Sequence, residues 1–351
     1  MRTTHRIICG DARDMTELDP NSVDLVVTSP PYPMIKMWDE TFASMNPVIG
    51  EAIEREDGRT AFELMHAELD LAWGEIHRVL KDGGIACINV GDATRSIGSR
   101  FQIYPNHSRI LSRLIDLGFQ ILPWIIWRKP TNAPTKFMGS GMLPAGAYIT
   151  LEHEFVLIAR KNGKRMFASE REKRRRRESA YFWEERNRWF SDVWTDLVGA
   201  SQPLRGEETR DRSAAFPLDL PTRLILMYSV YGDTVLDPFL GTGTTMRAAM
   251  ILGRNSIGIE IDKSLTGAVA ERLTDAIALG RLFIAERYDN HLRFVRERDS
   301  NKTPPRYYNQ RLRCPVMTSQ ETDMVFYELT SVRTADEDVI VAEYTPFDCG
   351  E

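Results

Sequence analysis

The chain has 351 residues, 42% of them hydrophobic and 27% charged, which is the composition of a soluble globular protein with one large domain or two ordinary ones. No apolar run approaches the roughly 20 residues that span a bilayer, no signal-peptide core is visible, and the four cysteines and six histidines are scattered, so we expect a cytoplasmic protein without a membrane partner or a metal site. The formal net charge is −5, but residues 161–212 carry 14 Lys and Arg against 10 Asp and Glu, which places a basic island in an acidic chain.

The first 160 residues alternate predicted strands with predicted helices. Apolar runs that end in turn residues predict strands at 6–11, 22–28, 85–90, 121–127 and 155–159, and helical spacing predicts helices at 61–80 and 107–117. This alternation predicts a doubly wound, Rossmann-like α/β fold on a parallel sheet.

The alternation stops at Lys161 and returns after residue 212. Helices are predicted at 218–230, 244–252 and 265–286, and strands at 234–236 and 256–261. From about Asp299 the chain is rich in proline and then acidic, with β-branched runs such as 338–342. We expect this last segment to be a small appended element or a partly disordered tail.

A glycine-rich turn joins the predicted strand at 234–236 to the helix that follows it, in the sequence TVLDPFLGTGTT. Glycines let the backbone pass close to a ligand, and the free amides at the start of the helix face it. Asp237 ends this strand, and Glu260 ends the next one, 17 residues after Gly243. That separation is close to the roughly 20 residues expected for a carboxylate that holds ribose hydroxyls.

The same turn lacks the third glycine of a dinucleotide-binding fingerprint and the lysine of a P-loop. Two carboxylates with no group for a phosphate suit S-adenosyl-L-methionine, which carries an amino group and ribose hydroxyls. A turn used only for tight packing does not require both carboxylates, so we give that interpretation low weight.

The predicted strand at 22–28 ends in Thr-Ser-Pro-Pro-Tyr. The prolines remove backbone donors, which leaves the carbonyl groups of Ser29 and Pro30 free to accept hydrogen bonds. The Ser29 hydroxyl adds an acceptor and Tyr32 adds a flat ring. Such a set suits a planar base with an exocyclic amine: the ring stacks on the base, and the acceptors take the amine hydrogens and localise its lone pair for attack on a methyl sulfonium.

The order of the two motifs, TSPPY before DPFLGTGTT, resembles the permuted β group of the amino-methylating DNA methyltransferases. These enzymes methylate the exocyclic amine of cytosine or adenine. Gly10-Asp11 resembles the turn that contacts the adenine of the cofactor, residues 215–217 resemble the motif that closes the cofactor pocket, and residues 152–157 resemble a later strand of the catalytic half. The resemblance covers roughly residues 6–160 and 213–285.

This resemblance implies that the cofactor is S-adenosyl-L-methionine and that the catalytic residues are Ser29, Pro30, Pro31 and Tyr32. It also implies a catalytic half at 1–160 and a cofactor-binding half at 213–298. We expect the segments that it does not cover to be a target-recognition insert at 161–212 and a C-terminal extension at 299–351. The cofactor-binding residues that it implies are Asp11, Phe216, Pro217, Asp237, Phe239, Gly241, Gly243, Thr244, Thr245 and Glu260.

In this family a serine at the first catalytic position mostly accompanies methylation of the cytosine N4 amine, and an aspartate mostly accompanies the adenine N6 amine. Ser29 therefore favours cytosine N4, with adenine N6 as the alternative. The expected reaction is direct, in-line transfer to a base flipped out of double-stranded DNA. A cognate restriction endonuclease and a homodimer are further partners that the sequence leaves open.

The basic island lies outside the resemblance and contains REKRRRR at 171–177. We expect Arg174, Arg175, Arg176 and Arg177 to bind DNA phosphates, and a solvated helix face explains the run about equally well. The aromatic residues at 181–194 fit either DNA contacts or core packing, and packing is favoured for Trp194.

Two other functions are weaker explanations of the motifs. An RNA or protein-amide methyltransferase normally has its cofactor turn before the catalytic motif, whereas here it follows. A docking peptide with Pro-Pro-x-Tyr lies in an exposed, disordered segment, whereas this motif ends an apolar strand.

Overall fold

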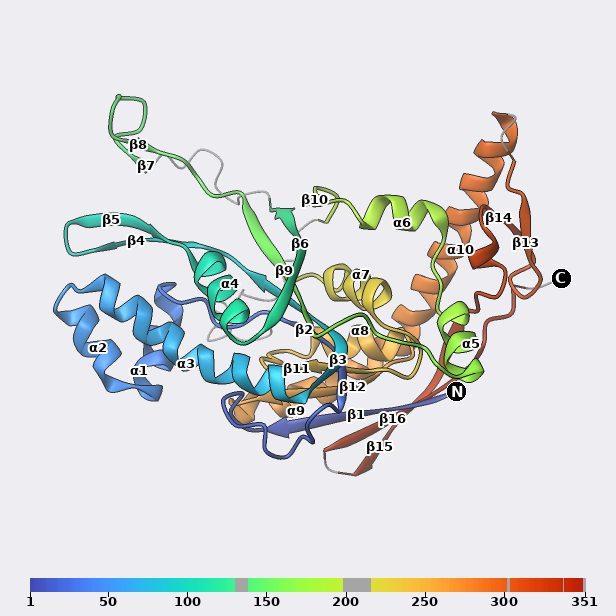
Figure 1. Ribbon diagram of the computed structural model, residues 1–351, viewed down its shortest axis with the longest axis horizontal. Helices are drawn as coiled ribbons and strands as arrows, with labels where there is room; N and C mark the ends of the chain where they lie inside the picture. Colours follow the sequence, from blue (N-terminus) through green and yellow to red (C-terminus); the bar gives the residue numbers. More distant parts are fainter. Residues whose placement is uncertain (130–137, 198–215, 302–303, 337, 350–351) are drawn as a thin grey trace.

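A computed structural model gives the structure of the chain and describes residues 1–129, 138–197, 216–301, 304–336 and 338–349. One large sheet runs through the molecule (Figure 1). Its strands are β1 (Arg2–Cys9), β2 (Val23–Thr28), β3 (Leu80–Val90), β6 (Phe119–Arg128), β9 (His153–Lys161), β10 (Val193–Trp194), β11 (Thr234–Asp237), β12 (Asn255–Glu260), β15 (Tyr327–Asp336) and β16 (Val339–Pro346).

The strand order is β10-β6-β9-β3-β2-β11-β12-β1-β16-β15. The five central strands, β3 to β1 in that order, pair in parallel. On either side, β9 and β6 and then β16 and β15 pair antiparallel. The predicted parallel sheet is therefore confirmed at its centre and wrong at its flanks, where β15 and β16 reverse direction through a short connection.

Helices cover both faces of the sheet, as the doubly wound prediction requires. α1 (Asp39–Met45), α2 (Pro47–Glu54), α3 (Gly58–Val79) and α4 (Asn106–Asp116) bury one core, and α7 (Asp219–Tyr228), α8 (Thr244–Ile251), α9 (Lys263–Arg272) and α10 (Ala276–Ser300) bury the other. Strand β2 separates the two cores: Leu25 and Val27 face one and Val23 and Val26 face the other, which explains why its sequence is apolar apart from Asp24 and Thr28.

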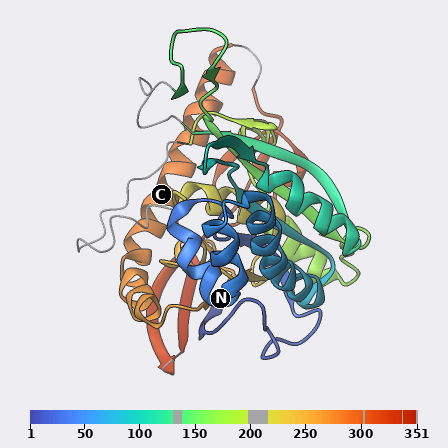
Figure 2. The ribbon, with the colours of Figure 1, turned by 90° about the vertical axis from the view of Figure 1, so that its left-hand side faces the viewer.

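Local sequence accounts for the position of α3. The side chain of Asp57 caps its first turn by accepting from the backbone amide of Thr60. Buried side chains then recur every three or four residues, at Ala61, Met65, Leu69 and elsewhere along the helix. This helix forms a wall beside the carboxyl ends of the parallel strands, and that side of the molecule faces the viewer in Figure 2.

The C-terminal segment differs from expectation. In its described part, β16 pairs with β1 from Arg2↔Glu343 to Arg6↔Val339, and β15 extends the sheet beyond it. The prediction of an appended element or a partly disordered tail is therefore wrong here, because the β-branched run at 338–342 completes the central sheet. A two-stranded sheet of β13 (Tyr307–Asn309) and β14 (Cys314–Val316) precedes it.

The insert is also joined to the main domain. It contains α5 (Glu170–Glu178), α6 (Trp183–Trp189) and β10, and β10 pairs with β6 and forms that edge of the sheet. Trp194 is buried and its indole donates to the Trp189 carbonyl, which confirms core packing for this residue.

Two smaller hairpins, β4 (Ala93–Ile97) with β5 (Arg100–Tyr104) and β7 (Met138–Gly139) with β8 (Ala147–Tyr148), project from the sheet (Figure 1). They touch where Phe101 stacks on Tyr148 at 4.5 Å between ring centres. Among the described residues, no helix combines the length and the apolar character needed to cross a membrane.

Candidate functional site

The two sequence motifs meet at the carboxyl edge of the sheet. Strands β2 and β11 are neighbours and pair in parallel through Leu25↔Val235 and Val26↔Leu236, so the residues that follow them emerge side by side. The Thr28 hydroxyl donates to Asp237 Oδ1 at 2.6 Å. This hydrogen bond joins the first residue of TSPPY to the first residue of DPFLGTGTT.

The turn after β11 has the backbone geometry that its glycines allow. Gly243 caps α8 with a φ of 81°, in the left-handed region, and a Cβ added there would lie 2.7 Å from Val269 Cγ1. Glu260 at the end of β12 braces the turn: its two oxygens accept from the backbone amides of Gly241 at 2.8 Å and Asp262 at 2.9 Å.

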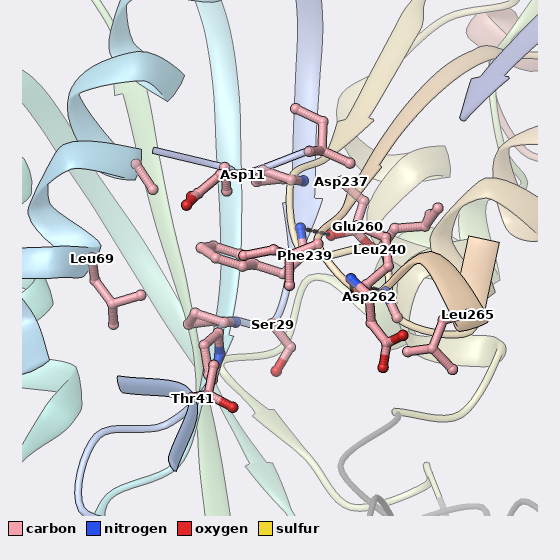
Figure 3. Close-up of a pocket in the computed structure, with 18 of the residues that line it drawn as sticks. Asp11, Ser29, Thr41, Leu69, Asp237, Phe239, Leu240, Glu260, Asp262 and Leu265 are labelled. Carbon is pink, nitrogen blue, oxygen red and sulfur yellow. Dashed lines mark hydrogen bonds between the residues drawn. The ribbon is translucent and has the colours of Figure 1, made fainter. Parts of the chain in front are cut away.

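A cavity of about 330 Å³ opens at this edge (Figure 3), a volume typical of small-molecule sites. Of the residues expected to bind the cofactor, seven line it and three do not: Pro217, Gly243 and Thr245 lie outside the lining. Ser29, Pro30 and Pro31 line it as well, and Tyr32 does not. The seven that line it are Asp11, Phe216, Asp237, Phe239, Gly241, Thr244 and Glu260.

The opposite wall of the cavity comes from residues that the sequence analysis did not identify. Six of them lie on η1 (Lys36–Trp38), α1 and α3, with the spacing of any core-facing helix, and the seventh, Arg13, lies in the loop after β1 and pairs with Glu68 of α3, so no sequence signal marked them. The residues are Arg13, Trp38, Thr41, Met45, Glu68, Leu69 and Ala72.

The cavity has an acidic lining. Asp237 is 2% exposed, and burial raises its pKa to about 6, although hydrogen bonds from Thr28, Thr245 and the Phe239 amide oppose that rise. Arg13 is the one basic residue of the lining, and it is already paired with Asp11 at 2.7 Å and with Glu68.

This lining fits S-adenosyl-L-methionine better than a phosphate-bearing nucleotide. Asp237, Glu260 and Asp262 add three carboxylates to a lining whose one basic residue is already paired, so the cavity favours a cationic ligand and disfavours phosphates. Glu260 already anchors the turn and, at the end of β12, occupies the position of a ribose-binding carboxylate.

Ser29 belongs to a hydrogen-bond network behind the cavity. Its Oγ lies 3.0 Å from the Tyr32 hydroxyl, which donates to Glu154 Oε2 at 3.1 Å. Asn89 Nδ2 donates to both the Tyr32 hydroxyl (3.0 Å) and Glu154 Oε2 (2.7 Å), and Lys129 Nζ donates to Glu154 Oε1 at 2.6 Å. Burial, and then the charge of Glu154, raise the Tyr32 pKa well above its usual value, so the phenol keeps its proton.

Asn89, Lys129 and Glu154 were not identified from the sequence. Asn89 interrupts the buried end of β3, and Glu154 lies at the start of β9. A polar residue at the end of an apolar strand was the available signal, but only the antiparallel pairing of β3 with β9 shows that the two approach each other.

The arginine run lies far from Ser29 in the fold. Helix α5 follows Arg165, whose guanidinium pairs with Asp233 at 2.6 Å and with Asp24 at 3.5 Å, and these carboxylates precede β11 and begin β2. The helix therefore lies at the amino edge of the sheet, opposite the cavity (Figure 1). The structure does not bring Arg174–Arg177 to the edge of the sheet at which Ser29 lies, and DNA binding by this run stays a prediction.

A second, open cavity of about 1380 Å³ lies next to α5 and α6. Among the described residues, Lys164, Arg176 and Arg186 have no acidic partner, although Arg176 stacks on Phe167 and Arg186 on Phe190. Seven basic side chains line it: Arg160, Lys164, Arg165, Lys173, Arg176, Arg177 and Arg186. The aromatic side chains there are Phe167, Tyr181, Trp183 and Tyr228.

Comparisons with known proteins identify the family of the chain. The family profile N6_N4_Mtase, described as DNA methylase, matches residues 23–271. The Type II methyltransferase M.MthZI of Methanothermobacter thermautotrophicus is 52% identical over 328 residues, which are 93% of this chain and 91% of that protein. M.MjaI of Methanocaldococcus jannaschii, also a Type II methyltransferase, is 50% identical over 282 residues, 77% of this chain and 91% of that protein.

A solved structure with a similar fold is TTHA0409 of Thermus thermophilus, a candidate DNA modification methylase in complex with S-adenosyl-L-methionine. It matches with a TM-score of 0.60 at 33% identity, over 78% of this chain and 94% of that chain. Because the family profile spans most of the chain and the two curated relatives are at least half identical to it, the chain belongs to the N6_N4_Mtase family of DNA methylases.

Proposed function

We propose that the chain is a Type II DNA methyltransferase that methylates the N4 amine of a cytosine flipped out of double-stranded DNA. The observation that carries this proposal is the meeting of two half-sites: an amine-binding Ser-Pro-Pro-Tyr loop and an acidic cofactor cavity, joined by the Thr28–Asp237 hydrogen bond. The two curated relatives, which are 52% and 50% identical to this chain, are both Type II methyltransferases and support the assignment of that type of enzyme.

When it is bound, S-adenosyl-L-methionine supplies an electrophilic methyl group on a positively charged sulfur. The chain binds and orients the amine that attacks it. Ser29 Oγ and the Pro30 carbonyl accept the two amine hydrogens, which withdraws the nitrogen lone pair from the ring and directs it at the cavity. The Tyr32 ring stacks on the base. The amine nitrogen forms the new N–C bond as the S–C bond breaks, which leaves a neutral thioether on the cofactor side, and the nitrogen then releases one proton to solvent.

The choice of cytosine over adenine depends on Ser29. Both bases present an exocyclic amine next to a ring nitrogen, so the acceptors of the loop suit either one. The serine at the first catalytic position favours cytosine N4, as in the family pattern described above, and adenine N6 is the alternative. Analysis of nucleosides from methylated DNA separates the two bases. We expect N4-methylcytosine, and the detection of N6-methyladenine instead would show that the alternative, adenine N6, is the target.

We also propose that the basic cavity beside α5 and α6 binds DNA backbone phosphates. Its unpaired cations and aromatic rings suit a polyanion, and Arg176 and Arg177 of the predicted DNA-binding run line it. Because this cavity lies at the edge of the sheet opposite Ser29, it would hold DNA remote from the target base.

The type of enzyme has two further implications. A Type II methyltransferase protects sites that a cognate restriction endonuclease cuts, so we propose such a partner and a cytoplasmic location where cellular DNA is accessible. A homodimer stays a prediction from the sequence. Expression of the chain in cells with unmodified DNA, followed by challenge of that DNA with restriction enzymes, tests protection directly.

A further inference from the structure

The hydroxyl of Tyr32 is the junction of the network behind the cavity. Three polar atoms surround it: Ser29 Oγ at 3.0 Å, Asn89 Nδ2 at 3.0 Å and Glu154 Oε2 at 3.1 Å. A phenol has one proton to donate and lone pairs with which to accept. The three contacts therefore have a restricted set of directions.

The direction of two of these bonds follows from the chemistry of the partners. An ionised carboxylate only accepts, and the Lys129 ammonium at 2.6 Å gives Glu154 the geometry of an ion pair. The Tyr32 proton therefore points at Glu154. Asn89 Nδ2 donates, because turning the amide over would place two acceptors 2.7 Å apart, at Asn89 and Glu154.

The remaining bond then has one possible direction. The Tyr32 proton is already donated to Glu154, so the Ser29 hydroxyl must donate to the Tyr32 oxygen. A serine hydroxyl has one proton and two lone pairs. Once that proton points at Tyr32, the Ser29 oxygen presents only lone pairs to the cavity that it lines.

We propose that Glu154 and Asn89 are positioning residues that act through Tyr32 to hold the Ser29 hydroxyl as an obligate acceptor for the target amine. This inference rests on the proposed function. A freely rotating hydroxyl would point its proton at the amine part of the time and would compete with the acceptor role. The network also gives Tyr32 a second task besides stacking, which explains why its hydroxyl is buried away from the cavity.

A double-mutant cycle of Tyr32→Phe and Glu154→Gln tests the inference. Tyr32→Phe keeps the ring and removes the junction, whereas Glu154→Gln can donate to the Tyr32 oxygen and reverse the chain of hydrogen bonds. We expect each single change to lower the single-turnover rate of methyl transfer to duplex DNA by about tenfold or more. The affinity for S-adenosyl-L-methionine, measured by calorimetry, should change little.

The decisive result is the double variant. If Glu154 acts through Tyr32, the double variant is no slower than the slower single variant, because the junction is already gone. Independent effects that multiply in the double variant would overturn the inference. The cycle of Asn89→Ala with Tyr32→Phe gives the same comparison if Glu154→Gln does not fold.

Glu152→Gln is the matched control, because Glu152 lies two residues away and its carboxylate contacts exposed Arg128 at 3.4 Å instead of Tyr32. Its rate should equal that of the unmodified chain. An unmodified chain that transfers no methyl group to DNA contradicts the proposed function, whereas active chains with multiplying effects contradict only the orientation of Ser29.

Discussion

The Thr28 hydroxyl donates to the Asp237 carboxylate at 2.6 Å, across 209 residues of sequence. The bond is buried and links the loop that would bind the amine to the turn that would bind the cofactor. Because it stabilises the charged form of Asp237, it couples the position of the catalytic loop to the charge of the cofactor cavity.

Thr28→Val keeps the shape of the side chain and removes this donor. We expect a loss of about 1 kcal/mol in the binding free energy of S-adenosyl-L-methionine. The loss should be larger at pH 6 than at pH 8, because without the Thr28 donor the Asp237 pKa rises further and more of the carboxylate is neutral at pH 6. Calorimetry at the two pH values measures both effects. Thr60→Val, at an exposed position of α3, is the control, and an equal response of the two variants would contradict the coupling.

Asp237 should make cofactor binding depend on pH. Its pKa is about 6 in the free protein, so the carboxylate is charged above that pH and neutral below it. A cationic ligand favours the charged form, and its affinity should therefore fall as the pH drops through about 6. Asp237→Asn should bind weakly and lose this dependence. An affinity of the unmodified chain that is flat from pH 5 to pH 8 would contradict the assignment.

The same group should affect stability with the opposite sign. Because the Asp237 pKa is raised above its unfolded value of 3.8, the folded chain holds that proton more tightly, and its contribution to the free energy of unfolding falls as the pH rises from about 4 to about 6. The loss is on the order of 3 kcal/mol. Denaturant titrations give the free energy of unfolding of the unmodified chain and of Asp237→Asn at pH 4.5 and pH 7. Relative to Asp237→Asn, the unmodified chain should be less stable at pH 7 than at pH 4.5.

The basic cavity should contribute to the affinity for long DNA duplexes and should not affect the activity on short ones. Replacement of Lys164, Arg176 and Arg186 by alanine should reduce the slope of log affinity against log salt by about 2 to 3 on long duplexes. Activity on a short duplex that covers only the recognition site should be unchanged, because these residues lie opposite Ser29. A triple replacement of exposed Arg2, Arg293 and Arg296 by alanine is the control. Equal slopes in the two triple variants would show that the cavity makes no specific contribution to DNA binding.

The insert and helix α10 should stabilise each other through one buried ion pair. Arg287 on α10 is buried and pairs with Glu185 on α6 at 2.6 Å. Arg287→Met leaves that carboxylate partly buried without its partner, and we expect the free energy of unfolding to fall by about 3 to 5 kcal/mol. Chemical denaturation measures the loss, and restoration of part of it by Glu185→Gln in the same chain would confirm that the unpaired charge is the cause.

Local patterns predicted the central strands and most helices, because each carries its own periodicity and turn residues. They did not predict the place of β16, whose partner β1 lies more than 330 residues earlier. Nor did they predict the break of the helix expected at 265–286 into α9 and α10. The charge of Arg174–Arg177 was evident from the sequence, but the edge of the sheet on which they lie was not.

The same limit applies to the site. TSPPY and DPFLGTGTT could be recognised because their residue types and spacing carry chemistry. Glu154 and Asn89 could not, since a single polar residue at the end of a strand is common and acquires a role only when antiparallel pairing brings it to Tyr32. The wall from α1 and α3 was missed for a similar reason, because its apolar residues look like ordinary core positions.

Single substitutions in the Ser-Pro-Pro-Tyr loop should lower the rate of methyl transfer without weakening the binding of the cofactor. Ser29→Ala removes an acceptor for the amine and should lower the single-turnover rate by about a hundredfold or more, while calorimetry shows little change in the affinity for S-adenosyl-L-methionine. Tyr32→Ala should behave in the same way, since it removes both the stacking ring and the junction. Full activity in both variants would contradict the assignment of the loop.

The most direct test of the central claim is nucleoside analysis of duplex DNA after incubation with the purified chain and isotopically labelled S-adenosyl-L-methionine. We expect labelled N4-methylcytosine with the unmodified chain and almost none with Ser29→Ala. Label in N6-methyladenine would contradict the choice of base, and label in 5-methylcytosine, or none in DNA, would contradict transfer to an exocyclic amine.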